Sequence, residues 1–241
     1  MGAFDFIGKI AARSADDRMR KLLVQYVVKS LTDKSGRIRA EDSICLAATI
    51  VGERCIDAAG DFPLRKHSFV PGSRVFSEKV NCLINGDLPA SEWSAYPKDS
   101  ILASLRSRLD PRIYTRATLP VVSELMKGYA AGIGVAADWG KVPLSVPKDN
   151  QPFVLPLQVG YNSRAFVDNL FSSISHDKLR CLRISAEALG DLLNLTAKVF
   201  DPTIALRLAV EIINGMSKTA PMTREALERV QPPVIGSTKQ E

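Results

Sequence analysis

Residues 41–60, EDSICLAATIVGERCIDAAG, form the stretch of sequence from which the fold follows. Placed at about 100° per residue, as on a helix, their apolar side chains point in every direction over the first two turns. A helix that is apolar all round has to be buried on most of its sides. The sequence therefore predicts a central helix, from Glu41 to Gly60, that the rest of the chain covers.

Both ends of this stretch carry signals that fit a helix. Glu41 and Asp42 place negative charge at the positive end of the helix dipole. Gly60 offers the left-handed residue that ends many helices. The central helix also carries one polar seam, whose residues are four apart: Thr49, Glu53 and Asp57.

Apolar residues with a period near 3.6 also occupy most of the chain on either side of the central helix. Ser73 and the Asp201-Pro202 pair fit the first positions of helices. The pattern predicts a mostly α protein: one domain over residues 1–230, with about eight to ten helices around the central one, and a flexible tail at 231–241. The surrounding helices are expected near residues 15–31, 74–84, 100–109, 120–129, 163–174, 185–200, 202–214 and 223–230.

Between residues 141 and 159 the apolar period changes from about 3.6 to about 2. Alternation of this kind, with turn residues in the middle, predicts a β-hairpin, and its four prolines suit edge strands. A two-stranded ribbon is marginal in water, so its apolar face needs a cover. Its own helices would provide one. A second copy or another protein is the alternative, and would contact Phe153, Leu155 and Leu157.

The composition describes an ordinary globular protein. Apolar residues make up 46% of the 241 residues and charged residues 24%, proportions typical of a chain that buries a core. The net charge of +6 predicts a mildly basic surface, which favours acidic partners without identifying one. No apolar run approaches the length that is needed to cross a bilayer.

The four cysteines stand singly within apolar helical patterns, at positions 45, 55, 82 and 181. Pairs at the spacing of zinc ligands are absent from the sequence. We therefore expect reduced thiols in the core, no metal site and no cofactor, with a disulfide pair as the alternative. The N-terminal residues lack the long apolar core of a secretory signal, which together with the cysteines favours a cytoplasmic protein.

The most suggestive local chemistry lies at residues 65–74. Arg65, Lys66 and His67 precede a Pro-Gly turn, and Ser73 and Arg74 are expected at the start of the next helix. A helix N-terminus with cations beside it attracts anions such as phosphate or a carboxylate. These five residues are a candidate anion site. A solvated basic loop is the alternative, because the spacing of a phosphate loop is absent.

Two further groups of basic residues could bind nucleic acid if they converge on one face. Acidic residues are interspersed along the chain, however, and scattered solvated charge is the commoner meaning of such a pattern. The first group is Arg106, Arg108, Arg112 and Arg116, and the second is Lys178, Arg180 and Arg183.

Residues that could carry catalysis are few. Glu53 and Asp57 are one helical turn apart and could share a cleft, although a polar seam on a buried helix explains them more simply. Cys82 and Cys181 could act as nucleophiles beside a histidine. Both cysteines, however, occupy positions where a small apolar residue is expected. We therefore assign no catalytic residue and lean against an enzyme.

From these patterns we expect a helical protein-interaction or regulatory module that associates with itself. The hairpin and the apolar segment from Phe4 to Ile10 would supply the contacts. The first alternative is a nucleic-acid-binding protein that uses the basic groups. The second is an enzyme or binder of an anionic small molecule at residues 65–74.

Overall fold

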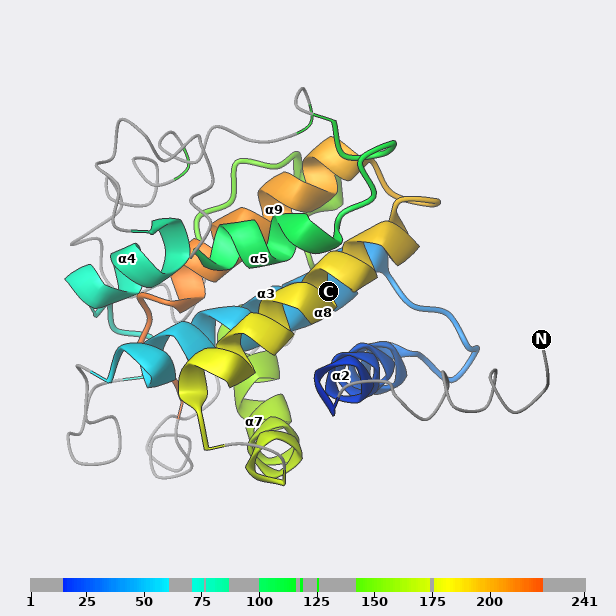
Figure 1. The fold of residues 1–241 in the computed structure, drawn as a ribbon. Coiled ribbons are helices and arrows are strands. Elements are labelled where there is room, and N and C mark those ends of the chain that lie inside the picture. The colour runs from blue at the N-terminus through cyan, green and yellow to red at the C-terminus, as the bar shows by residue number, and fades with distance from the viewer. Residues whose placement is uncertain are drawn as a thin grey trace, which may run out of the picture.

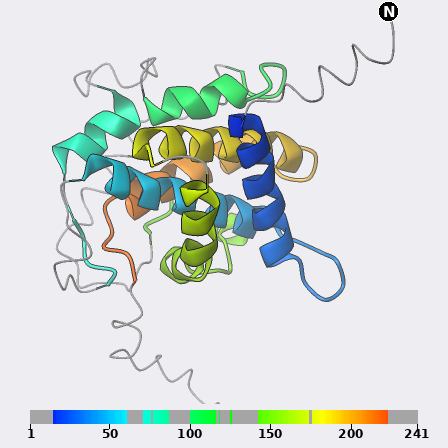
Figure 2. The same ribbon diagram turned by 60° about the horizontal axis from the view of Figure 1, so that its bottom comes forward.

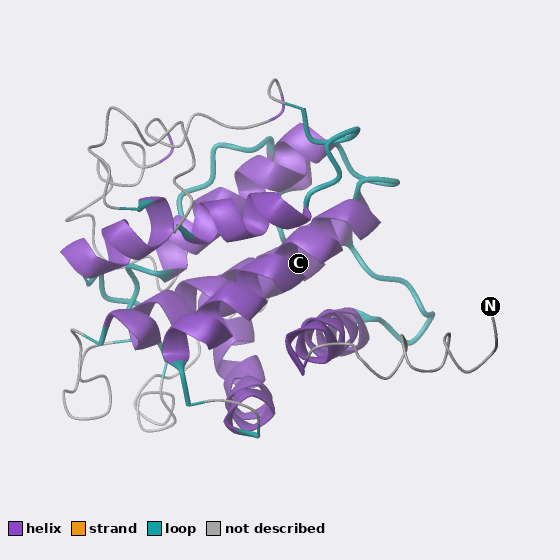
Figure 3. Ribbon diagram, in the orientation of Figure 1, coloured by secondary structure: helices purple, strands orange, loops and turns teal. Residues whose placement is uncertain are grey.

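The computed structural model describes residues 15–60, 71–75, 77–86, 100–115, 118, 125, 142–173 and 176–222. Within these ranges the chain forms α-helices, short 3-10 segments and no strand, as Figure 3 shows, so the mostly α fold is confirmed. The elements are α2 (Ala15–Leu31), α3 (Ala40–Ala59), α4 (Glu78–Asn85), α5 (Ile101–Arg108), η3 (Lys148–Asn150), α7 (Pro156–Ser172), α8 (Lys178–Thr196) and α9 (Pro202–Met216).

Helix α3 lies at the centre of the arrangement (Figure 1). It packs along α8 and α9, and α7, α2 and α4 cover other parts of its surface. Helix α5 packs on α8. In the turned view of Figure 2, α2 crosses one end of the pair formed by α3 and α8. The helices therefore form a shell around one central rod.

The predicted central helix is confirmed almost to the residue. Ile44 is fully buried, and Leu46 and Ile50 are each 2% exposed. Gly60 ends the helix in the left-handed conformation, and its N–H donates to the carbonyl of Ile56. The all-round apolar pattern thus corresponds to burial on all sides.

Close contact between α3 and α9 depends on Gly52. A Cβ at this position would lie 2.7 Å from the Cβ of Met216 and 2.9 Å from the backbone nitrogen of Ser217. Such distances are too short for a side chain. The missing side chain therefore lets the end of α9 lie directly against the middle of α3.

Buried apolar side chains from the seven described α-helices belong to one cluster. It extends from Met19 on α2 to Met216 on α9 and also includes Val142 and Val146 from the segment before α7. A second, smaller cluster of buried side chains joins Ile56, Val75 and Ala220.

The hairpin predicted at 141–159 is wrong for the residues described there. Residues 142–155 form loop and the 3-10 helix η3, and α7 begins at Pro156. Proline lacks the N–H that a strand ladder needs, but it fits the first turn of a helix, where that N–H has no partner. The alternation of apolar residues therefore reflects a loop that leads into a helix.

Several helix boundaries differ from the prediction. Ser73 does not cap α4, because Ser77 holds that position and accepts a hydrogen bond from the N–H of Val80 at 3.2 Å. Helix α8 begins at Lys178, seven residues before the predicted start, where Asp177 accepts from two backbone N–H groups. The expected count of eight to ten helices is not confirmed. The segment Phe4 to Ile10 and the tail at 231–241 lie outside the described residues.

Candidate functional site

Phe153 presents an aromatic ring to solvent on the surface beside the start of α3. Its side chain is 81% exposed. Its backbone N–H donates to the Asp42 carboxylate at 2.7 Å, and the N–H of Val154 donates to the same oxygen at 3.3 Å. Asp42 in the first turn of α3 thereby fixes the backbone of a loop far away in the sequence, and with it the position of the ring.

Arg39 holds the ring from one side. Its guanidinium lies 3.4 Å from the centre of the Phe153 ring, a cation–π contact. The same guanidinium pairs with Glu41 at 3.3 Å and donates to the carbonyl of Gln151 at 3.4 Å. Arginine and aromatic side chains are the types most enriched where proteins bind one another.

Two aliphatic side chains that neighbour Arg39 and Phe153 in the sequence are also exposed. Ile38 is 37% exposed and precedes Arg39, while Leu155 is 48% exposed and follows Phe153 by two residues. We call Ile38, Arg39, Phe153 and Leu155 the Phe153 surface. Farther along α7, the Phe166 ring stacks on Tyr26 of α2 with 3.9 Å between ring centres and 8° between planes.

Of the three predicted contact residues, the structure brings two to the surface and buries the third. Phe153 and Leu155 are exposed, whereas Leu157 is 1% exposed and belongs to the core. A strand would place all three on one face. Because α7 begins at Pro156, residues 155 and 157 instead point to different sides.

The predicted anion site is only partly described. Ser73 and Arg74 lie in an extended segment that pairs with residues after α9, with an antiparallel bridge between Arg74 and Thr219. The carbonyl of Ser73 accepts from the N–H of Ala220 at 2.7 Å. These two residues therefore precede α4 by several positions and do not form its first turn. Arg65, Lys66 and His67 lie outside the described residues.

The second basic group takes part in ion pairs between α2 and α8. Asp16 contacts Arg180 at 2.6 Å and Arg183 at 3.1 Å. The hydrogen bond from Arg180 holds the pKa of Asp16 below its ordinary value. Much of the positive charge of this group is therefore compensated within the protein.

The ion pairs continue inward through Arg20, whose side chain is 7% exposed. Arg20 contacts Asp17 at 2.7 Å, Asp191 at 2.5 Å and Glu187 at 3.5 Å. Arg108 of the first basic group contacts the other oxygen of Asp191 at 3.0 Å. We call these eight charged residues the α2 ion-pair network: Asp16, Asp17, Arg20, Arg108, Arg180, Arg183, Glu187 and Asp191.

The carboxylate pair considered for acid–base chemistry is occupied by internal contacts. Glu53 accepts from Arg164 at 2.7 Å and packs against Gly160, so its carboxylate faces α7. Burial raises the pKa of Glu53, and Arg164 acts against that rise. Asp57 pairs with Arg54 at 3.1 Å. Glu53 therefore joins α3 to α7, whereas the pair of Asp57 with Arg54 lies within α3.

The buried thiols are poor nucleophiles. Cys45, Cys55 and Cys181 are buried thiols. Burial raises the pKa of each of these thiols, which disfavours the reactive thiolate. Cys82 is a partly exposed thiol.

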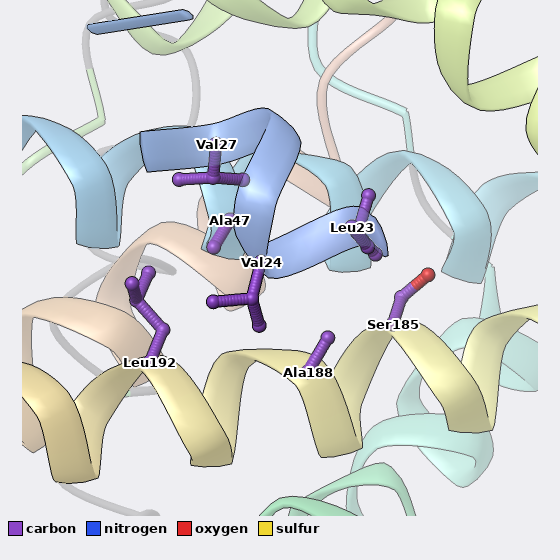
Figure 4. Close-up of a pocket in the computed structure, with 7 residues that line it drawn as sticks. All are labelled: Leu23, Val24, Val27, Ala47, Ser185, Ala188 and Leu192. Carbon is purple, nitrogen blue, oxygen red and sulfur yellow. The ribbon is translucent and has the colours of Figure 1, made fainter. Parts of the chain in front are cut away.

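A small apolar hollow lies under α2, where α2 crosses α3 and α8 (Figure 4). It leaves no space for a water molecule, so it is not a ligand site. The residues around it are Leu23, Val24, Val27, Ala47, Ser185, Ala188 and Leu192.

Among the described residues, no group of three or more histidine, cysteine or acidic side chains could hold a metal ion. None of the described helices combines the length and the apolarity that crossing a bilayer requires. The fold and the surface thus define an all-α domain with an exposed aromatic–arginine contact. Comparisons with family models, curated proteins and solved structures find no match for this chain.

Proposed function

We propose that this protein is a helical interaction module that associates with itself through the Phe153 surface. The observation that carries the proposal is an aromatic side chain that is both 81% exposed and fixed in place. Exposing an aromatic ring to water gives up the free energy that burial would provide. Holding the ring in one position lowers the entropy cost of a later contact.

The mixture of charges supports a second copy of this chain as the partner. The Phe153 surface contains Arg39, and Glu41 lies beside it at 3.3 Å. In a dimer with twofold symmetry the same patch meets itself, so a patch with both charges and an apolar centre can complement its own copy. Leu157 has no part in this contact because it lies in the core.

The test is sedimentation velocity over a wide range of protein concentrations, with the unaltered chain and Phe153→Ser. We expect the unaltered chain to form dimers. Loss of a central aromatic contact costs about 2 kcal/mol, so the dissociation constant of the variant should rise about 30-fold. The backbone N–H that donates to Asp42 is kept in this variant, so the loop should stay in place.

The matched control is Val199→Ser. Val199 is 82% exposed, as much as Phe153, but it lies in the turn between α8 and α9. This substitution should leave dimer formation unchanged. A chain that stays monomeric at all concentrations, or a Phe153→Ser variant that associates as tightly as the unaltered chain, would contradict the proposal.

Nucleic-acid binding is the alternative function, and it predicts a different dependence of affinity on salt. Ion pairs with acidic residues engage Arg108, Arg180 and Arg183, which weakens the expectation of an uncompensated basic face. If the alternative holds, affinity for nucleic acid falls steeply with salt, because each phosphate contact releases counterions. The same titration separates this alternative from self-association through an apolar surface.

A further inference from the structure

Helix α2 is attached to the body through one well-defined face. Its buried apolar residues are Met19, Leu23 and Val27. They pack against α3 and α8, and a small apolar hollow, too narrow for a water molecule, lies between the three helices (Figure 4). The α2 ion-pair network adds charged contacts, of which those to α8 join residues more than 160 positions apart.

The connection between α2 and α3 has few ties to the body. Residues 32–38 are exposed, and in Figure 2 this loop projects away from the helices. Its turn is held locally, because Asp33 accepts from the backbone N–H groups of Ser35 and Arg37. Straightening the loop would therefore break local hydrogen bonds and leave the core intact.

Opposite charges face each other in a fixed order across the interface between α2 and α8. Helix α2 contributes Asp16, Asp17 and Arg20, and α8 presents groups of the opposite sign to Asp16 and Arg20 in a fixed order: Arg180 and Arg183, then Glu187 and Asp191. Any α2 of this sequence fits any α8 of this sequence in the same orientation.

We infer that two copies of the chain exchange their α2 helices, so that each α2 packs on α3 and α8 of the other copy. The exchange preserves every contact of the α2 interface. It opens only the loop at 32–38, so Arg39 keeps its contact with Phe153. This inference rests on the proposed function, since it describes how the self-association is built.

The position of the Phe153 surface gives the exchanged dimer its additional contact. Ile38 and Arg39 lie at the end of the loop, and Arg39 stacks on Phe153. When the loops of two copies run past one another, their two Phe153 surfaces come close together. Burial of these exposed apolar groups would favour the dimer over two closed monomers.

Charge reversal tests the exchange with one variant on each side of the interface. Arg20→Glu alone places a carboxylate beside Asp191, and Asp191→Arg alone places two guanidinium groups together, so each variant should melt below the unaltered chain. In a mixed exchanged dimer, Glu at 20 meets Arg at 191 across one interface, and the other interface is unaltered. The mixture should therefore regain thermal stability. Native mass spectrometry should find mixed dimers well above the statistical one half.

The control pair is Arg112→Glu with Asp110→Arg. These residues pair at 2.7 Å within one exposed turn, so exchange of α2 does not bring them together between copies. Mixing these two variants should leave the thermal stability and the share of mixed dimers unchanged. If mixing Arg20→Glu with Asp191→Arg also leaves stability and the share of mixed dimers unchanged, α2 packs within its own chain and the exchange is wrong.

Cysteine cross-linking between α2 and α8 tests the exchange even if the charge variants do not fold. Val24 and Ala188 line the same hollow from α2 and α8 (Figure 4). In a chain with both Val24→Cys and Ala188→Cys, mild oxidation should give covalent dimers on a non-reducing gel, whereas Val24→Cys alone should not.

Two contrary outcomes can be told apart. Bonds within single chains, in a protein that sediments as a dimer, would overturn the exchange and leave the self-association standing. A chain that is monomeric throughout would overturn both.

Discussion

Gly52 sets how closely α3 and α9 approach, so it offers a direct test of the central packing. The Cβ of Gly52→Ala would lie 2.7 Å from the Cβ of Met216, and the backbone of Ser217 cannot move aside easily. Overpacking a core costs about 1 to 3 kcal/mol, and we expect about 2 kcal/mol here after the better helix propensity of alanine is included. Urea unfolding measures the change.

Gly36→Ala is the comparison for this experiment. A Cβ at Gly36 would have no neighbouring atom within 4 Å, but the φ of 79° at this residue disfavours alanine. We expect a loss of about 1 kcal/mol, which reflects backbone conformation only. A Gly52→Ala variant that is no less stable than Gly36→Ala would show that the two helices have room to separate.

Lys218 gives the protein a pH-dependent stability. Its side chain is 6% exposed and donates to Asn214 at 2.6 Å. Burial lowers the pKa of Lys218 to about 8. The unfolded chain keeps the proton up to the ordinary pKa of 10.5. Between these two values the unfolded state binds more protons at Lys218, so the contribution of Lys218 to stability rises with pH.

Lys218→Met should remove this rise. Below pH 8 the unaltered protein bears the full cost of a buried charge, up to about 3 kcal/mol, and this cost disappears as the pH increases from about 8 to 10.5. Urea unfolding across this range measures the difference in slope. Lys198→Met is the control because Lys198 is exposed. Parallel slopes for Lys218→Met and the unaltered chain would contradict the prediction.

At the scale of elements, the attachment of α2 depends on Arg20. Removing its guanidinium with Arg20→Met keeps most of the apolar stem but leaves three carboxylates close together. Because this arginine is largely buried, we expect a loss of about 2 kcal/mol in unfolding free energy. Thermal unfolding at low and high salt measures the loss, which should shrink as salt screens the carboxylates.

Arg112→Met is the matched control for this element. Arg112 also pairs with a carboxylate, but its side chain is 87% exposed. Exposed ion pairs contribute little, so the change should stay within about 0.5 kcal/mol. If Arg20→Met and Arg112→Met lower the unfolding free energy equally, burial of Arg20 does not strengthen the attachment of α2.

The elements also show where sequence reasoning succeeds. Helix α9 begins as predicted, because Asp201 caps it and Pro202 fits its first position. The helix expected at 202–214 continues two residues farther, to Met216. Gly215 continues the helix and lies against Val142, whose side chain fills the space that a Cβ there would need. A glycine that ends a helix and one that permits close contact look alike in a sequence.

At the scale of the whole molecule, the pattern of apolar residues predicts a buried rod but not which helices lie beside one another. The ion pairs of Arg20 join positions that are 167 and 171 residues apart, and no local pattern signals them. For the same reason the sequence identifies Phe153 as a contact residue without indicating Arg39 and Asp42 as the groups that hold it.

The apolar pattern along the chain is enough to predict a mostly α fold and its central helix. Apolarity on every side of residues 41–60 can be satisfied only by burial, whatever the surrounding topology. The tertiary structure alone decided which charges are compensated and which side chains face water. Leu155 and Leu157 differ because α7 starts between them, and Asp16 meets Arg180 because α2 folds onto α8. Those outcomes depend on contacts between distant segments, which form only when the chain is folded.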